Sequence, residues 1–211
     1  MDTITGILIG NFEEKDAAQE RGLALSRKLV RACRTTTIAI HRKDRDTVKK
    51  NLLTARNYLR EMNETLGKYP EIYYKGPVGQ AQQEYAECII TYSILCENKT
   101  LEELPTPQQM EVEDSAYLNG LAEAGGKLRR HVLDLIREDK PAEGEKYLQI
   151  MDNIYSFLIM FDYPDVITAN LRRHTDVLRS LNEKTRGDLT HALQQYKFQK
   201  LMTNSQEINQ I

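Results

Sequence analysis

Two glutamates near the middle of the chain have the spacing of a metal-binding pair. Glu84 and Glu87 stand three residues apart in the segment Q-Q-E-Y-A-E-C. On a helix, side chains at this spacing lie about 60° apart on one side. Two such carboxylates can share a Mg²⁺ or Mn²⁺ ion, because hard cations prefer oxygen ligands. A solvated helix face produces the same spacing, so both interpretations stay open on this pair alone.

A third carboxylate follows in a glycine-rich helical segment. Glu123 is flanked by Gly120, Gly125 and Gly126, and each glycine costs a helix about 1 kcal/mol relative to alanine. Close approach of another helix, a metal ion or a phosphate would explain them. A metal ion held by Glu84, Glu87 and Glu123 could activate a water and stabilise the charge that develops on a phosphoryl group.

The net charge of −2 conceals a strongly basic segment. Residues 21–50 hold ten Lys or Arg and two Asp, a local charge of +8, so the remainder of the chain carries about −10. A second basic cluster begins at Arg172 and Arg173. Local excess of this kind binds polyanions even on a weakly acidic protein, whereas its other interpretation is two solvated helix faces.

Other kinds of site find little support in the sequence. The four histidines show no HExxH or paired spacing, and neither GxxxxGK[ST] nor GxGxxG is present. No GxSxG or Cys/His signature indicates covalent catalysis. Three cysteines without a CxxC spacing are interpreted as reduced core residues of a cytoplasmic protein. No apolar run approaches the ~20 residues that span a membrane, and the N-terminus lacks the basic region of a secretory signal.

Long segments with a 3.6-residue apolar period must position these side chains, and they predict an all-α, up-and-down bundle of six to seven helices in a single domain, 1–211. Residues 1–11 are expected to form an N-terminal arm and residues 203–211 a flexible tail. On the helix of Glu84, the apolar stripe contains Tyr85 and Cys88. Projection places Glu84 at the edge of this stripe and Glu87 further out.

The helices are predicted at about 12–42, 44–66, 78–97, 114–138, from Pro141, and from Pro164 to about Met202, with Gly187 dividing the last. Loops are predicted at 67–77 and around Pro105 and Pro107.

Four ordered segments resemble the translin family, which includes translin and translin-associated factor X. The run S-R-K-L-V-R-A-C-R-T-T-T-I-A-I-H-R, residues 26–42, is similar to the long first helix of translin-associated factor X. Q-E-Y-A-E matches the family's Q-E-Y-x-E, and Y-L-N-G-L-A-E-A-G-G-K-L-R-R resembles Y-L-x-G-x-A-D-x-x-G-E-L. The stretch L-R-R-H-T-D-V-L-R-S-L-N-E-K-T-R-G-D-L-T is similar to the family's C-terminal basic helix. Together they identify the chain as an archaeal-type member.

The resemblance implies a seven-helix protomer in a homo-oligomeric, octameric shell that binds RNA or single-stranded DNA on its inner surface. In the family's catalytic branch it implies a metal-dependent endoribonuclease. Glu84 and Glu87 match the two metal-binding glutamates. Glu123 stands where the active subunit has Asp, and Lys127 stands where it has Glu. Lys127 could pair with Glu123 at i,i+4 and withdraw it from the metal, or hold a substrate phosphate as a point charge.

The first hypothesis is therefore a magnesium-dependent ribonuclease in which Glu84, Glu87 and Glu123 hold the ion. Phosphates would be bound by basic residues, namely Arg27, Arg31, Arg34, Lys127, Arg172 and Arg173. A shell protein of the same family that binds nucleic acid without cutting it is the second hypothesis, supported by Glu123 and Lys127. An all-α NTP pyrophosphohydrolase also uses ExxE pairs with magnesium, but normally supplies a second pair three residues apart. A helical scaffold would leave the basic clusters unexplained.

Overall fold

The long helices form where apolar side chains recur at helical spacing, and α2 (Arg45–Leu66) shows how. Its buried side chains are Val48, Ala55, Leu59, Met62 and Leu66, which fall on one stripe. The Asp44 carboxylate caps the first turn by accepting a hydrogen bond from the Thr47 amide at 3.1 Å. α2 therefore begins at a polar cap and lays its apolar stripe against α1.

A computed structural model describes residues 2–74 and 77–208 of the chain. Over that range the chain is helical and contains no strand, which confirms the predicted all-α bundle. The long helices are α1 (Asp2–His41), α2, α4 (Pro77–Leu95), α6 (Asp114–Arg137), α7 (Pro141–Leu158) and α9 (Leu171–Ile208).

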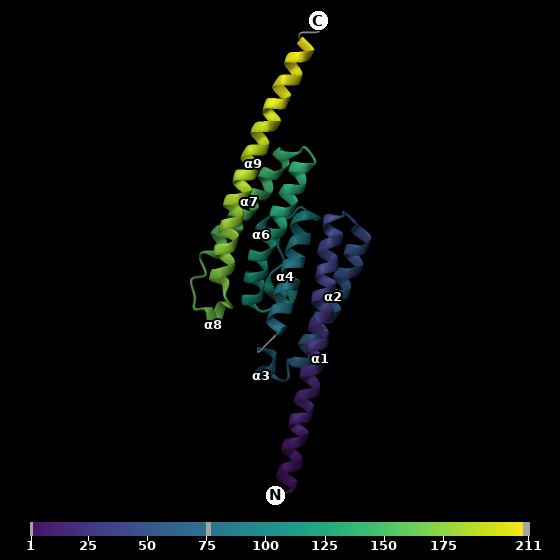
Figure 1. The fold of residues 1–211 in the computed structure, drawn as a ribbon. Coiled ribbons are helices and arrows are strands. Elements are labelled where there is room, and N and C mark those ends of the chain that lie inside the picture. Colours follow the sequence, from purple (N-terminus) through teal and green to yellow (C-terminus); the bar gives the residue numbers. More distant parts are fainter. Residues whose placement is uncertain (1, 75–76, 209–211) are drawn as a thin grey trace.

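The helix α4 is the centre of the arrangement. It packs against α1 on one side and α6 on the other, while α2 covers α1, and α7 and α9 pack on α6 (Figure 1). Large side chains from these helices meet in one core, among them Leu29, Leu59, Ile90, Leu121 and Met151. Side chains on α4 are consequently enclosed by neighbours from two directions.

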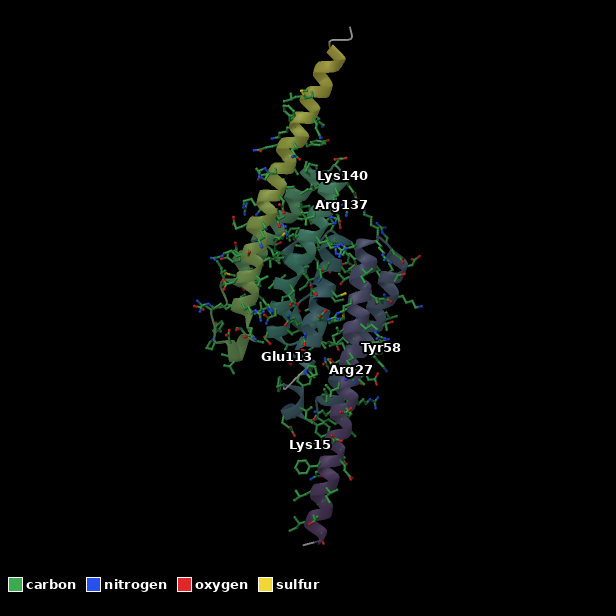
Figure 2. The ribbon with its side chains drawn as sticks, viewed as in Figure 1. Lys15, Arg27, Tyr58, Glu113, Arg137 and Lys140 are labelled. Atoms are coloured by element: carbon green, nitrogen blue, oxygen red, sulfur yellow. The ribbon has the colours of Figure 1, made fainter. Side chains whose placement is uncertain are left out.

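Two of the long helices extend beyond the bundle at opposite ends (Figure 1). The first buried residue along α1 is Ala18, and the last along α9 is Leu189, counted over the described side chains. Figure 2 shows Lys15 on the projecting part of α1. The predicted start of this helix at 12 was ten residues late, because residues 2–11 continue the helix as its outer end.

The predicted division of the last helix at Gly187 is wrong, since α9 is continuous. A Cβ at Gly187 would meet no atom within 4 Å, so the residue faces open space. Neighbouring contacts tie this part of α9 to the bundle. Arg186 Nη2 donates to the Asp152 carboxylate at 2.9 Å, and Arg129 Nη2 donates to Asp188 at 2.8 Å. These contacts, together with buried Leu189, offset the roughly 1 kcal/mol that a glycine costs a helix. α9 also runs past Met202 to Ile208, and residues 209–211 of the expected tail lie outside the described range.

Short helical segments replace parts of the predicted loops, namely α3 (Pro70–Tyr73), η1 (Leu101–Glu103) and α5 (Pro107–Met110). A further short helix, α8 (Asp165–Thr168), lies where the last long helix was predicted to begin, so that prediction is wrong for residues 164–170. α8 begins after Pro164, where the last long helix was expected to start, and Ala169 and Asn170 have positive φ values of 51° and 66°. This left-handed pair ends α8 and separates it from α9. Of the predicted loop at 67–77, residues 75–76 fall outside the described part.

None of the described helices is both long and apolar enough to cross a membrane.

Candidate nucleic-acid and metal site

The site lies where α6 crosses α4, and Gly120 determines how closely the two helices approach. A Cβ on Gly120 would lie 2.7 Å from the Gln83 carbonyl oxygen and 2.8 Å from the Glu87 backbone nitrogen. Backbone atoms cannot move aside without shifting a helix, so only glycine fits here. Of the three explanations that the glycines left open, an approaching helix holds for Gly120. It also holds for Gly125, whose added Cβ would clash with Leu178 of α9.

This close crossing reverses the predicted order of burial of the two glutamates. The Glu87 side chain is only 8% exposed, whereas that of Glu84 is 20% exposed. The projection treated α4 as having one covered side, but α6 covers the face that carries Glu87. The pKa of Glu87 is raised, chiefly because burial disfavours its charged form, although Lys127 acts in the opposite direction.

The buried Glu87 carboxylate forms an ion pair with Lys127. Lys127 Nζ lies 2.9 Å from Glu87 Oε1, so the ammonium of α6 reaches across to α4. The expected pairing of Lys127 with Glu123 on its own helix is not what the structure contains. A charge-assisted hydrogen bond of this length stabilises a carboxylate that burial would otherwise destabilise.

Each of the other two candidate carboxylates also has a cationic or titratable neighbour. Arg34 Nη2 of α1 lies 3.4 Å from Glu84 Oε1, and His174 Nε2 of α9 lies 3.8 Å from Glu123 Oε1. The His174 ring is oriented by Asn119. The Asn119 amide nitrogen donates to the carbonyls of Ser115 and Thr168, so its oxygen is left to accept from His174 Nδ1. Nε2 then faces Glu123.

These side chains surround one hollow of about 430 Å³ between α1, α4, α6 and α9. The charged or titratable residues that line it are Arg34, Glu84, Glu87, Glu123, Lys127 and His174. We call it the first hollow. Gly126 also lines it, and a Cβ there would meet only Leu181 Cδ1, at an ordinary contact distance of 3.8 Å.

The hollow brings the three predicted metal ligands together only loosely. Glu84, Glu87 and Glu123 all line it and offer hard oxygen donors. Among the described residues, however, no three His, Cys, Asp or Glu side chains are gathered closely enough to hold a metal ion. The cation beside Glu87 is the Lys127 ammonium. The residues as placed therefore do not fit a three-carboxylate metal site, and the magnesium site stays a prediction.

The predicted phosphate-binding residues divide into two groups. Arg27, Arg31 and Arg34 follow one another at i, i+4 and i+7, which makes an exposed row along α1 that leads to the first hollow. Arg27 lies on the part of α1 within the bundle (Figure 2). Arg172 and Arg173 are exposed at the start of α9 but do not line the hollow.

Sequence reasoning missed His174 as a member of this site, although it directly follows Arg173. The only feature of the sequence that could have indicated this role is the position of His174 in the basic segment L-R-R-H-T-D, because the spacing between the histidines does not indicate a site. The cysteines also need a correction. Cys33 and Cys88 are free and buried as expected, but Cys96 at the end of α4 is exposed.

No family model matches the chain. An uncharacterized protein of Methanocaldococcus jannaschii is 35% identical over 192 residues, which cover 90% of this chain and 83% of that protein.

Solved structures give a closer description of the fold. The crystal structure of AfC3PO is 30% identical with a TM-score of 0.81, covering 89% of this chain and 96% of that one. A complex of AfC3PO with duplex RNA is 29% identical with a TM-score of 0.80, and 89% and 95% of the two chains are covered. Apo-NeC3PO, at 20% identity and a TM-score of 0.74, covers 90% and 96% and shares the fold.

Proposed function

Because this chain belongs to the translin family, we propose that it binds RNA as a homo-oligomer. The observation that carries the proposal is the row Arg27, Arg31 and Arg34 on one face of α1, in a chain similar over most of its length to AfC3PO, whose structure with duplex RNA has been solved. Guanidinium groups in such a row meet successive phosphates of a nucleic-acid strand. Phosphate contacts of this kind give affinity without reading the base sequence.

Arg27 and Arg31 carry the unpaired charge of the row. Arg34 is paired with Glu84, whereas Arg27 and Arg31 are exposed and form no ion pair among the described residues. The first hollow adds little net charge of its own, because its carboxylates lie beside Arg34, Lys127 and His174. RNA is therefore expected to bind along α1 and to be positioned over the first hollow. Single-stranded DNA would be held by the same phosphate contacts.

Self-association is supported by apolar side chains on the projecting helix ends. On α1 these include Ile4, Ile7, Leu8 and Phe12, and Phe12 is 69% exposed. On α9, Phe198 and Leu201 are exposed beyond the bundle. Apolar surface of this kind is typical of a contact between subunits. The resemblance to the family's shell proteins makes an octamer the expected stoichiometry, so light scattering should give a mass near eight times 24.4 kDa.

The test of RNA binding is charge reversal at Arg31. Fluorescence anisotropy with labelled RNAs of unrelated sequence should show weaker binding of Arg31→Glu to all of them. For the unchanged protein, the logarithm of affinity should fall with that of salt at a slope of about −0.9 to −0.7 per phosphate contact. Lys68→Glu makes the same charge change at an exposed position outside the row and is the matched control. If both variants bind alike, the row is a solvated face and this assignment of the RNA-binding surface is wrong.

A second function, RNA cleavage dependent on Mg²⁺ or Mn²⁺, is proposed for the same hollow. It is supported by Glu84, Glu87 and Glu123 lining one cavity beside the α1 row. The residues fit an ion only if Lys127, whose side chain is 35% exposed, leaves Glu87. Short labelled RNA incubated with Mg²⁺, Mn²⁺ or EDTA tests this. A nucleoside triphosphate in parallel tests the pyrophosphohydrolase alternative.

Two sets of variants make the cleavage test specific. Glu84→Gln or Glu87→Gln should abolish cutting while RNA affinity changes little, because glutamine keeps the volume but loses the charge. If the parent protein does not cut, Lys127→Glu combined with Glu123→Asp restores the family residues. Failure of that double variant to cut would leave RNA binding as the function of this hollow.

A further inference from the structure

A second and larger hollow of about 870 Å³ lies near the C-terminal end of α1. Its walls are the last turn of α1, the first turn of α2, the end of α4 and the last turns of α6. Ile38 on α1 lines it, one helical turn beyond Arg34 of the first hollow. Arg137 on its rim lies at the opposite end of the bundle from the projecting part of α1 (Figure 2). We call it the second hollow.

The second hollow holds cations that the protein itself does not neutralise. Arg42, Arg45, Lys49 and Arg130 line it, and within the described residues none of them forms an ion pair. Two further cations are paired, Lys43 with Glu138 and Arg137 with Asp134, both at 3.4 Å. Arg45 and Lys49 also lie on the first two turns of α2, where the helix dipole adds partial positive charge. The surplus charge favours an anionic ligand.

One nitrogen of a buried imidazole that lines the second hollow lacks a hydrogen-bond partner. The His41 side chain is only 7% exposed, and its Nδ1 lies 3.9 Å from Asp134 Oδ2, beyond hydrogen-bond distance. His41 Nε2 is buried with no hydrogen-bond partner. Buried polar nitrogens normally have a hydrogen-bond partner, so an unpaired one on a residue that lines a cavity favours a ligand oxygen beside that residue. Burial, followed by nearby Arg130, lowers the pKa of His41 and keeps the ring neutral.

Part of the wall is apolar. Tyr92 and Leu95 of α4 and Ile38 of α1 line it, and Ile38 is 50% exposed. An aromatic ring beside aliphatic side chains is a surface on which a nucleobase stacks. The volume of the second hollow also falls in the roughly 300–1,000 Å³ range of small-ligand sites, so it exceeds what a phosphate ion alone would need.

We propose that the second hollow binds a nucleotide through its phosphate monoester. The phosphate would lie among Arg42, Arg130 and His41, and the base would lie against Tyr92. The nucleotide is either a free mononucleotide or the phosphorylated end of an RNA strand. This site is separate from the RNA-binding row and the first hollow, and it depends on neither.

Calorimetric titration of the full-length protein with AMP tests the site, with adenosine and inorganic phosphate as comparisons. AMP should bind more tightly than either. Arg130→Met should weaken AMP binding about tenfold or more, since it removes a charge-assisted contact. Arg179→Met removes the same charge from an exposed position on α9 outside both hollows and should leave binding unchanged. AMP that binds no better than adenosine, or equally well to Arg130→Met, would overturn the proposal.

Cys96 gives a second readout that needs no variant. It is exposed, lines the second hollow and is a free thiol, whereas Cys33 and Cys88 are buried internal controls. AMP should slow alkylation of Cys96 by iodoacetamide, followed by mass spectrometry. Unchanged alkylation of Cys96 at saturating AMP would contradict binding in this hollow.

A final comparison identifies the source of the nucleotide. Short RNA with a 5′-phosphate and the same RNA with a 5′-hydroxyl are titrated against the protein and Arg130→Met. A preference for the phosphate that Arg130→Met removes assigns the site to strand ends, whereas AMP binding without that preference assigns it to free mononucleotides. Arg31→Glu should weaken binding of long RNA but not of AMP, so failure of the RNA-binding proposal and failure of this one give different results.

Discussion

The two hollows share three helices, α1, α4 and α6, to which the first adds α9 and the second adds α2, yet their charges are arranged in opposite ways. In the first, each carboxylate lies beside a cationic or titratable group from another helix, as Glu87 does with Lys127 at 2.9 Å. In the second, four cations have no ion pair among the described residues and His41 Nε2 has no hydrogen-bond partner. The carboxylates of the first hollow are thus neutralised by side chains of the protein, whereas the second hollow keeps unpaired cations and an unpaired imidazole nitrogen.

The residues whose spacing is easiest to recognise in the sequence are not the ones with unpaired charge in the folded chain. Glu84 and Glu87 form the pattern that the sequence makes conspicuous, but their charge is already balanced by Arg34 and Lys127. A divalent cation at the first hollow must compete with an ammonium that is covalently part of the site. The second hollow also contains carboxylates, but Arg42, Arg45, Lys49 and Arg130 form no ion pair among the described residues, so an anion beside them displaces no carboxylate.

The largest effect on stability is expected from a substitution at the crossing of α4 and α6, beside the first hollow. Gly120→Ala places a Cβ against the Gln83 and Glu87 backbone, so α6 must move away from α4. We expect a loss of about 3 kcal/mol in the free energy of unfolding, the upper end for overpacked cores. Urea unfolding followed by circular dichroism measures it.

Gly126→Ala is the matched control on the same helix. Its Cβ has room, so the variant should be unchanged or more stable by up to about 1 kcal/mol, the helix preference for alanine. Equal stability of the two variants would mean that α4 and α6 are not in close contact at Gly120.

A smaller effect is expected from leaving Glu87 without its cation. Lys127→Met keeps the side-chain length but removes the ammonium, and we expect a loss of about 2 kcal/mol near neutral pH. This is less than the 3–5 kcal/mol of a fully buried pair, because Lys127 is partly solvated. The loss should shrink in acid, where Glu87 becomes protonated.

Adding Glu87→Gln to Lys127→Met should recover much of that stability, because no buried charge is then left unpaired. The same urea unfolding at pH 7.5 and 5 measures all three proteins. A double variant no more stable than Lys127→Met alone would show that the ion pair is not the cause.

The smallest expected effect is on the pH dependence of stability. His41 of the second hollow and Glu87 of the first hollow contribute to it with opposite signs. The pKa of His41 is lowered in the folded protein, so below about pH 6.5 the unfolded chain takes up a proton first and stability falls as pH falls. The raised pKa of Glu87 acts the other way. Its ionisation above about pH 4.5 costs stability as pH rises.

Melting temperatures between pH 5 and 7.5 separate these contributions. His41→Asn should lose less stability than the unchanged protein on going from pH 7.5 to 5, because asparagine does not titrate. His131, whose pKa burial also lowers, keeps part of the slope in that variant. A steeper acid loss in His41→Asn would contradict the assignment.

The parts of the fold that depend on local pattern were predictable from the sequence. Helix α2 was expected at 44–66 and spans Arg45–Leu66, because a polar cap and a glycine bracket its apolar stripe. Pro141 was expected in the first turn of a helix and begins α7. The continuity of α9 was not predictable, since it depends on contacts from Arg129 and Asp152 of other helices.

The site was predictable in its membership but not in its pairing. Spacing placed Glu84 and Glu87 on one side of a helix, and the resemblance added Glu123 and Lys127. Which glutamate is buried, and that Lys127 reaches Glu87 instead of Glu123, depend on how α6 crosses α4 at Gly120. The second hollow could not be foreseen, because its cations come from α2, α6 and the turn between α1 and α2, which meet only in the folded chain.

The projecting ends of α1 and α9 have a consequence for how stability depends on protein concentration. Before Ala18 and after Leu189 these helices have no buried side chain among those described, and they carry apolar residues such as Phe12 and Phe198. An isolated helix end of this kind gains little from its own chain. If subunits cover these ends, association stabilises the folded state by mass action. Dilution would then lower the melting temperature and fray the two ends before the bundle between them.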